Sequence, residues 1–274
     1  MITEDRIEAV PIRDCAENKI STHSLSPDQA NVINNVESGH NIYFTGDAGT
    51  GKTFVIKQIE KHLRNKNIAY ATLAPTGISA LNVNGSTLHR YFSLPYGPYE
   101  LNETILLKSN DDEMYDRVSK LQVIIIDEVS MIPVDLFEVI HKICQISEFR
   151  NKNPLHKLPF GGKQLILSGD FFQLPPVVTN RNINFYSYRY RTSEPFSFVS
   201  PVWNDCDFKY LELSVQHRQQ GEKQQGYRDA LSNVKIANEK CLKFFNQRVS
   251  SHVDDTTLVL ATNNALVNKR NTQQ

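Results

Sequence analysis

The 274-residue sequence predicts an α/β fold, with a parallel sheet flanked by helices. Two observations carry this prediction. Short apolar runs rich in β-branched residues recur along the chain, and amphipathic stretches of helical periodicity separate them. Nearly continuous apolar runs are typical of strands that are covered on both faces. Alternation of such strands with helices predicts a parallel sheet with right-handed crossovers.

The expected strands are short and are buried between polar segments. They cover residues 41–46, 69–74, 123–128, 164–170, 209–214 and 257–262. Three intervening stretches lack a clear period and are expected to be loops or insertions: 93–116, 150–163 and 178–197. Residues 1–24 are polar and without pattern, and we expect a loose N-terminal arm there.

Helical periodicity is clearest in two stretches. In residues 53–65 the apolar side chains share one face, while lysine, glutamate and arginine point outward. Residues 134–146 repeat this pattern after Pro133, a residue well suited to the first turn of a helix.

Composition bounds the class of protein. No window approaches the roughly 18 apolar residues of a membrane span, and the first residues do not resemble a secretory signal. The four cysteines are scattered, which argues against a zinc site or a disulfide framework and fits a reducing, intracellular compartment. Thirty acidic and thirty basic residues balance, so a nucleic-acid surface would have to be a local patch.

The segment GDAGTGKT, Gly46 to Thr53, follows an expected strand and begins an expected helix. This is the context of a P-loop, in which glycines let backbone N–H groups curl around phosphate oxygens at a helix N-terminus. Lys52 would reach the β- and γ-phosphates, and the Thr53 hydroxyl would bind Mg²⁺. The predicted nucleotide-binding residues are Gly46, Ala48, Gly49, Thr50, Gly51, Lys52 and Thr53.

An acidic pair ends another strand, in VIIIDEVSM. Asp127 is placed to hold Mg²⁺, and Glu128 is the natural general base for an attacking water. Beside a P-loop, this pair favours hydrolysis over mere binding.

Gln29 lies in the first turn of a helix that Ser26 or Pro27 opens. Its amide can both donate to and accept from an adenine edge. Taken alone it indicates only a capped helix, but it stands just before the P-loop strand, which makes it a candidate adenine contact.

Three further segments follow later strands: APTGISALNVNGSTLHRYF (74–92), GDFFQLPPV (169–177) and LELSVQHRQ (211–219). Together with the P-loop and the acidic pair, they resemble the petite-integration-frequency family of DNA helicases, in the RecD-like branch of superfamily one. The resemblance runs from about residue 25 to residue 271. It implies a RecA-like P-loop NTPase lobe that uses ATP and Mg²⁺ and acts on single-stranded DNA and DNA forks.

The resemblance also implies roles for individual residues. Gln173 would sense the γ-phosphate or the attacking water, in a turn shaped by Gly169 and Asp170, and Arg218 would stabilise charge in the transition state. The predicted catalytic residues are therefore Lys52, Glu128, Gln173 and Arg218.

Residues 74–92 are the expected DNA contact. The resemblance implies that Thr76, Ser86, Thr87 and His89 hold phosphates without reading sequence. Phe92 either stacks on a base or belongs to the core. In the stretch 178–197, Tyr186, Tyr188 and Tyr190 alternate with Arg181, Arg189 and Arg191, so these rings either stack on nucleobases or pack on their own domain.

We divide the chain into the arm, a RecA-like lobe at 25–220, and connecting helices with the start of a second RecA-like lobe at 221–274. The later motifs of that second lobe are absent from these 274 residues, so we expect the chain to be either a fragment of a longer protein or a truncated product. The main hypothesis is the ATPase lobe of an ATP-dependent DNA helicase, which the resemblance implies would move 5′ to 3′ on single strands. The alternative is an ATP-dependent DNA-binding or regulatory module that does not translocate. A P-loop ATPase acting on protein fits the segments 74–92 and 165–177 poorly.

Overall fold

A computed structural model of the chain describes residues 25–100, 111–180, 182–217 and 239–247, together with residues 226, 230, 265, 267, 268 and 272. Residues up to 215, apart from 47–49, form one compact unit; residues 47–49 and those from 216 onward form another. The expected arm at 1–24, Arg218 and the expected strand at 257–262 lie outside the described residues.

The elements follow one another in a strand–helix alternation. They are α1 Pro27–Glu37, β1 Ile42–Gly46, α2 Lys52–Asn65, β2 Tyr70–Ala74, α3 Gly77–Asn82, β3 Ser86–Thr87, α4 Leu88–Tyr91, α6 Asp112–Ser119, β4 Val123–Ile126, η1 Val129–Met131, α7 Val134–Arg150, η2 Pro154–Lys157, η3 Pro159–Gly162, β5 Gln164–Ser168, α8 Ile183–Tyr190, η4 Ser197–Val199, α9 Pro201–Asp205, β6 Lys209–Leu213 and α11 Glu239–Asn246.

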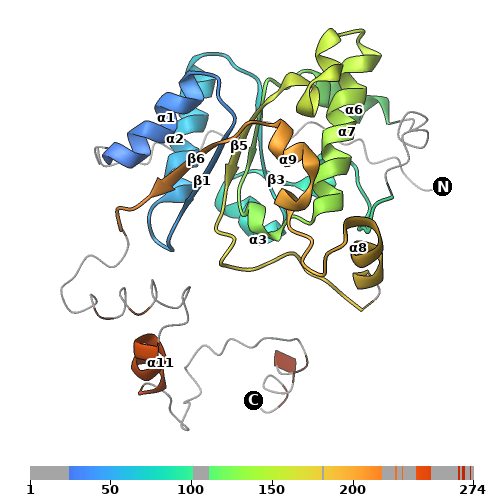
Figure 1. Ribbon diagram of the computed structural model, residues 1–274. Helices are drawn as coiled ribbons and strands as arrows, with labels where there is room; N and C mark the ends of the chain where they lie inside the picture. The colour runs from blue at the N-terminus through green and yellow to red at the C-terminus, as the bar shows by residue number, and fades with distance from the viewer. Residues whose placement is uncertain are drawn as a thin grey trace. The chain divides into compact units, whose positions relative to one another are not determined.

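The first unit is built on a six-stranded sheet in the order β3-β2-β4-β5-β1-β6 (Figure 1). Every paired strand runs parallel to its neighbour. The predicted parallel sheet flanked by helices, of RecA-like type, is therefore confirmed. One detail is wrong: β6 was expected to be covered on both faces, but it is the edge strand, and Tyr210 on it is 65% exposed.

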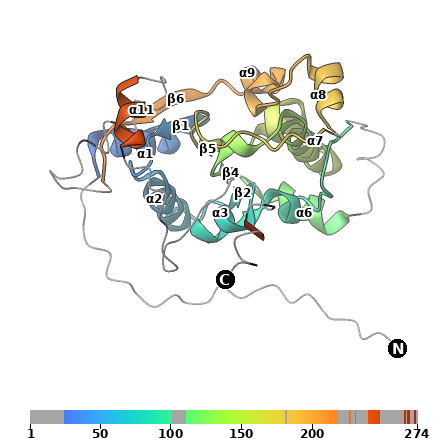
Figure 2. The same cartoon turned by 90° about the horizontal axis from the view of Figure 1, so that it is seen from below.

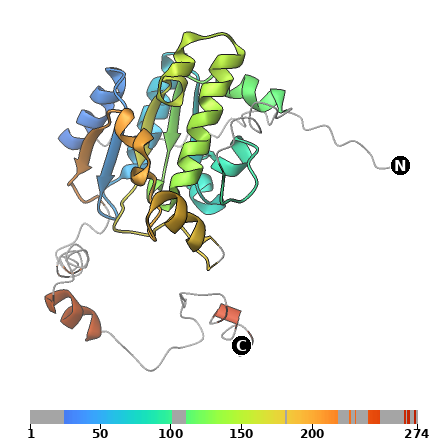
Figure 3. The same ribbon diagram turned by 45° about the vertical axis from the view of Figure 1, so that its right-hand side comes forward.

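Helices cover both faces of the sheet (Figure 2). On one face, α1 and α2 pack against apolar side chains of β1, β4 and β5, and Val55, Ile56 and Ile59 of α2 are fully buried there. On the other face, α6, α7 and α9 enclose the larger core, which Phe137 and Trp203 help to fill. The long helix α7 lies along this face, as Figure 3 shows.

All three stretches expected to be loops or insertions contain helical segments, and 150–163 contains the short 3₁₀ helices η2 and η3. The stretch 178–197 contains α8, and the end of 93–116 begins α6. The hydroxyl of Tyr186 donates to Asp135 at 3.1 Å, and that of Tyr190 donates to Glu138 at 2.8 Å, both on α7. These two tyrosines thus pack on their own domain, whereas Tyr188 is 80% exposed.

None of the helices in the described parts of the chain combines the length and apolar character needed to cross a membrane.

Candidate nucleotide site

The site is built at the carboxyl edge of the sheet, where strand ends converge. The phosphate loop follows β1, Asp127 follows β4, and Gly169 and Asp170 follow β5. Because β5 pairs with both β1 and β4, the topology places these three exits side by side. Segments that are far apart in sequence thus share one edge.

The backbone of the phosphate loop is closely packed. A Cβ on Gly46 would lie 2.5 Å from the Thr50 Oγ1 and 2.7 Å from the Leu213 carbonyl oxygen, so only glycine fits. Gly51 has a φ of 88°, in the left-handed region that favours glycine, and α2 begins directly after it. The Lys52 Nζ donates to the Gly46 carbonyl at 2.8 Å, which holds its charge inside the loop.

Ala48 and Gly49 belong with Asp47 to the second unit. Gly49 has a φ of 92°, again the left-handed region, and Ala48 is exposed. Within that unit, the backbone N–H of His217 donates to the Gly49 carbonyl at 3.0 Å.

Asp127 is buried and Glu128 is half-buried. Burial raises the pKa of Asp127, while the Ser168 hydroxyl, the Glu128 N–H and Lys52 oppose this shift. The Glu128 pKa is also raised, first by burial and then by the neighbouring Asp127 charge, against the attraction of Lys52. Carboxylates and a lysine that perturb one another in this way are typical of functional sites.

The backbone at Glu128 is strained. Its φ of 54° and ψ of 45° lie in the left-handed region, which is unfavourable for a residue with a side chain. The residues that follow β5 lie close to this turn, since a Cβ on Gly169 would be 2.9 Å from the Val129 N.

Asp170 organises the turn that carries Gln173. Its Oδ2 accepts from the Gln173 Nε2 at 3.0 Å, its Oδ1 accepts from the Phe172 N–H at 3.1 Å, and its carbonyl accepts from the Gln173 N–H at 2.8 Å. The predicted shaping role of Asp170 is confirmed. Asp170 is buried whereas Gln173 is exposed, so a fixed carboxylate holds a side chain that faces solvent.

Gln29 is 2% exposed and contacts the phosphate loop. Its Nε2 donates to the Thr50 carbonyl at 3.4 Å, while its Oε1 accepts from the Ser26 N–H at 3.2 Å in a capping box. The amide therefore links α1 to the loop in this structure, and its contact with adenine stays a prediction.

One positioning residue escaped the sequence analysis. The Oδ2 of Asp28 accepts from the Ser214 N–H at 2.7 Å and from the Val215 N–H at 3.3 Å, which anchors the end of β6 to α1. Burial raises the Asp28 pKa, but hydrogen bonds from Ser26, Ser214, Val215 and Gln29 outweigh it and lower the pKa to about 2. An aspartate in a first helical turn indicates only a local cap, so the sequence held no signal for this long-range contact.

The predicted DNA contacts lie between β2 and α4. The Thr76 and Thr87 side chains cap α3 and α4, by accepting from Ser79 N at 3.2 Å and Arg90 N at 3.3 Å. Ser86 and Thr87 form the edge strand β3. His89 packs against the Tyr96 ring at a centroid distance of 4.8 Å, and burial lowers its pKa. Phe92 is fully buried, so it belongs to the core.

The residues fit ATP and Mg²⁺ on their chemistry. The hydroxyl of Thr53 and the carboxylate of Asp127 are the hard oxygen ligands that Mg²⁺ prefers. The glycine cradle at Gly46 and the Lys52 ammonium suit phosphate oxygens. Within the described residues, the Ser130 hydroxyl is buried without a hydrogen-bond partner.

A RecA-like parallel sheet with a glycine-rich loop after β1 and an acidic pair after β4 is the architecture of the P-loop NTPases. The chain belongs to the PIF1-like helicase family, whose sequence model matches residues 24–239.

Individual relatives are similar over most of this chain. It is 34% identical over 207 residues to the ATP-dependent DNA helicase Pif1 of Psychrobacter sp. strain PRwf-1, covering 75% of this chain and 29% of that protein. A structure of Pif1 helicases concerned with DNA unwinding at forked double-stranded DNA superimposes with a TM-score of 0.76 at 27% identity, covering 90% of this chain and 57% of that one. Pif1 from Bacteroides in complex with ADP-AlF3 and single-stranded DNA superimposes with a TM-score of 0.73 at 27% identity, covering 91% and 56%. The chain thus spans little more than half the length of these solved chains.

Proposed function

We propose that this chain is the ATP-hydrolysing lobe of a DNA helicase, which couples ATP hydrolysis to 5′-to-3′ translocation on single-stranded DNA and to duplex unwinding. The observation that carries this proposal is the convergence of Lys52, the pair Asp127–Glu128 and the Asp170–Gln173 turn at one edge of the sheet. A site for binding alone has no need of a base and a sensor beside the phosphate loop.

The relatives support the choice of substrate. They are named ATP-dependent DNA helicases, and one solved relative holds ADP-AlF3 together with single-stranded DNA. Forked DNA is the subject of another. We extend ATP, single-stranded DNA and DNA forks to this chain as its cofactor and partners, and DNA repair, recombination or telomere and genome maintenance as its setting. Such a motor acts inside the cell.

Each residue has a physical task in this proposal. Lys52 binds phosphate oxygens, and Thr53 and Asp127 hold Mg²⁺, which neutralises phosphate charge when bound. Glu128 accepts the proton of the attacking water, and its raised pKa makes it a stronger base. Gln173, fixed by Asp170, orients toward the same water or the γ-phosphate, and Arg218 adds positive charge.

The proposal also covers the organisation of the chain. Residues 25–220 would be the ATPase lobe, and 221–274 would hold connecting helices and the start of a second RecA-like lobe. Strand movement needs both lobes, so the rest of the second lobe is the partner expected in the full-length protein.

ATP hydrolysis measured with and without an oligothymidylate tests this proposal. We expect hydrolysis that Lys52→Ala reduces to background, and that single-stranded DNA stimulates in a protein with both lobes. Lys57→Ala, an exposed lysine on the same helix, serves as the control and keeps the wild-type rate. A wild-type rate of ATP hydrolysis in Lys52→Ala would refute the proposed nucleotide site. A rate of ATP hydrolysis that single-stranded DNA does not change across a range of salt would refute a DNA motor.

A further inference from the structure

A basic stretch lies at the opposite edge of the sheet from the phosphate loop. Residues 149–163 contain Arg150, Lys152, Lys157 and Lys163 and no acidic residue, in a chain whose formal net charge is zero. Helix α7 starts near Glu128 at the carboxyl edge and has 17 residues, so that its end at Arg150 lies about 25 Å away. In Figure 1 this stretch forms the turn above α7. The proposed ATP and DNA contacts use none of its residues.

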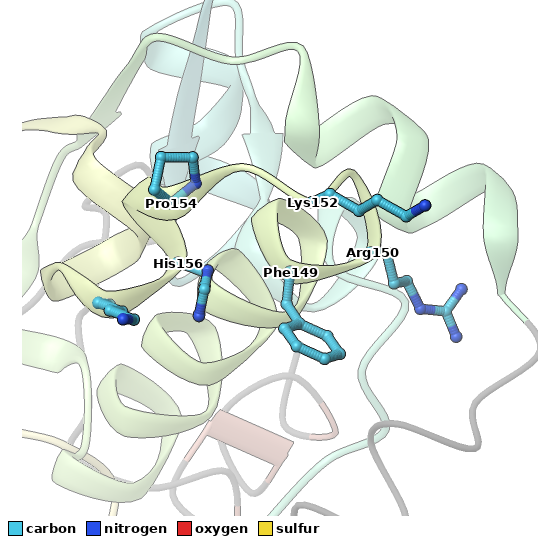
Figure 4. A pocket seen from close by; sticks show the side chains of 6 residues that line it. Phe149, Arg150, Lys152, Pro154 and His156 are labelled. Carbon is cyan, nitrogen blue, oxygen red and sulfur yellow. The ribbon is translucent and has the colours of Figure 1, made fainter.

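A pocket of about 530 Å³ opens on this stretch, a size that suits one nucleotide. Two aromatic rings are among the side chains that line it (Figure 4): Phe149 and His156 point the same way, with ring centroids 5.4 Å apart in an edge-to-face arrangement. Phe149 is 55% exposed, which is unusual for a large apolar ring unless it has a partner. The pocket is lined by Phe149, Arg150, Lys152, Pro154, His156 and Lys157.

Buried polar contacts fix the shape of this pocket. Beneath it, the Lys163 Nζ and Glu148 Oε1 form a buried ion pair at 2.6 Å, and the Asn153 Nδ2 donates to the Glu148 Oε2 at 2.5 Å. The Asn153 N–H also donates to the Glu148 carbonyl at 2.9 Å, and the Asn153 carbonyl contacts the His156 Nδ1 at 2.7 Å. The turn is thus held in place before any ligand arrives, which lowers the entropy lost on binding.

The positive charge of the pocket is partly free. Arg150 pairs with Asp112 at 2.6 Å and lies over the Tyr115 ring, so its charge is largely compensated. Lys152 and Lys157 are exposed, and neither has an acidic partner within ion-pair distance in the part of the chain that the structure describes. Two lysines therefore flank the rings with charge available to a ligand.

We propose that this pocket binds one nucleotide of a single-stranded DNA segment, with its base against Phe149 and its flanking phosphates facing Lys152 and Lys157. The inference rests on the proposed DNA motor, to which it adds a second contact on the edge of the lobe away from the ATP site.

The chemistry of the pocket favours a nucleotide over an acidic polypeptide. Both ligands bring negative charge to Lys152 and Lys157. Only a nucleobase also offers a flat face to Phe149, and aromatic rings beside cations are the usual features of single-strand binding. Paired bases are stacked inside a duplex, so duplex DNA should bind this pocket less well than a single strand.

Photocrosslinking of the 274-residue protein locates the contact. An oligothymidylate that carries 5-iododeoxyuridine is irradiated with the protein, and the attached peptide is identified by mass spectrometry. We expect attachment at Phe149, and loss of this adduct in Phe149→Ala with other adducts retained. Unlabelled single strands should suppress the adduct more strongly than duplex DNA or polyglutamate of equal charge.

The salt dependence of DNA affinity measures the phosphate contacts of Lys152 and Lys157. We expect Lys152→Gln/Lys157→Gln to reduce the slope of log affinity against log salt by about 1.4, since each phosphate contact on a single strand contributes about 0.7. Phe149→Ala should weaken binding about fivefold, at the low end for base stacking on an exposed ring. The matched control is Lys57→Gln/Lys61→Gln, which removes the same charge from exposed positions on α2 and should leave the Phe149 adduct unchanged.

These experiments distinguish a failure of the proposed pocket from a failure of the proposed helicase function. Adducts at other residues but none at Phe149, or equal salt slopes for the two lysine pairs, would overturn the pocket and leave the proposed function standing. Suppression by polyglutamate as strong as by DNA would replace the nucleotide with an acidic polypeptide, and would also overturn it. An adduct at Phe149 in a protein whose ATP hydrolysis ignores DNA would support the pocket and count against the motor.

Discussion

The Tyr186 hydroxyl donates to the buried carboxylate of Asp135 at 3.1 Å, across 51 positions of sequence. The same carboxylate accepts from the Tyr99 N–H at 2.8 Å. Asp135 stands in the first turn of α7, just after the Asp127–Glu128 turn. One side chain therefore ties α8 and the loop at Tyr99 to the helix that leaves the nucleotide site.

We expect Tyr186→Phe to lower the free energy of unfolding by about 1–3 kcal/mol, because it removes a donor from a buried carboxylate. Tyr188→Phe is the matched control, since this ring is 80% exposed on the same helix and its change should stay within about 0.5 kcal/mol. Chemical denaturation measures both variants. Equal stability of the two would show that the Asp135 contact contributes nothing.

Glu128→Gln should keep ATP binding and lower the rate of hydrolysis about 10²- to 10⁴-fold, because an amide cannot accept the proton of water. The change keeps the shape of the side chain. Single-turnover hydrolysis, together with the affinity for a fluorescent ATP analogue, separates chemistry from binding. An unchanged rate would exclude Glu128 as the base.

Asp170→Ala should lower kcat about 10- to 100-fold with little change in KM for ATP, because Gln173 loses the carboxylate that orients it. Asp170→Asn keeps one acceptor oxygen and should recover part of the rate. This rescue is the informative measurement. A kcat that is equally low in both variants, with equal loss of thermal stability, would indicate a purely structural role.

The stability of the fold should fall as pH is lowered toward 4, in part through His141. Its Nδ1 accepts from the Phe160 N–H at 3.0 Å, and burial, helped by Lys142, lowers its pKa from 6.5 to about 4. A depressed histidine pKa stabilises the fold above the unfolded value of 6.5, and this contribution of up to about 3 kcal/mol is lost between pH 6.5 and 4.

Urea denaturation between pH 7 and 4 measures this effect. His141→Gln cannot titrate, so its unfolding free energy should depend less steeply on pH than that of the wild type. Parallel pH profiles would rule out His141 as the source.

Five of the six strands in the described residues were predictable because their signals are local, and the nucleotide-binding roles of the loop residues stay predictions. The five expected strands that lie in described residues were found to within two residues at either end, and four of them are buried, as apolar runs in a parallel sheet predict. The two-residue strand β3 was not expected. The phosphate loop and the acidic pair were equally clear. These features need no knowledge of distant partners.

Other parts depend on contacts that no local pattern reveals. Helix α8 looked like a loop because the partners that fix it, Asp135 and Glu138, lie about fifty positions earlier. Asp28 looked like a helix cap, yet it anchors the end of β6. The exposure of β6 follows from its position at the edge of the sheet, which the sequence of the strand alone does not indicate.

The closeness of Gly169 to Val129 sets a limit on how this site can vary. The turn that bears Glu128 and the turn that bears Gln173 are in contact at Val129 and Gly169, with no room for a methyl group between them. Gly169→Ala would keep every reactive side chain of the site and still push the turns that bear Glu128 and Gln173 apart. A screen that scores variants by lost function would mark Gly169 as catalytic. Its actual contribution is the absence of a side chain, which lets the two turns approach each other.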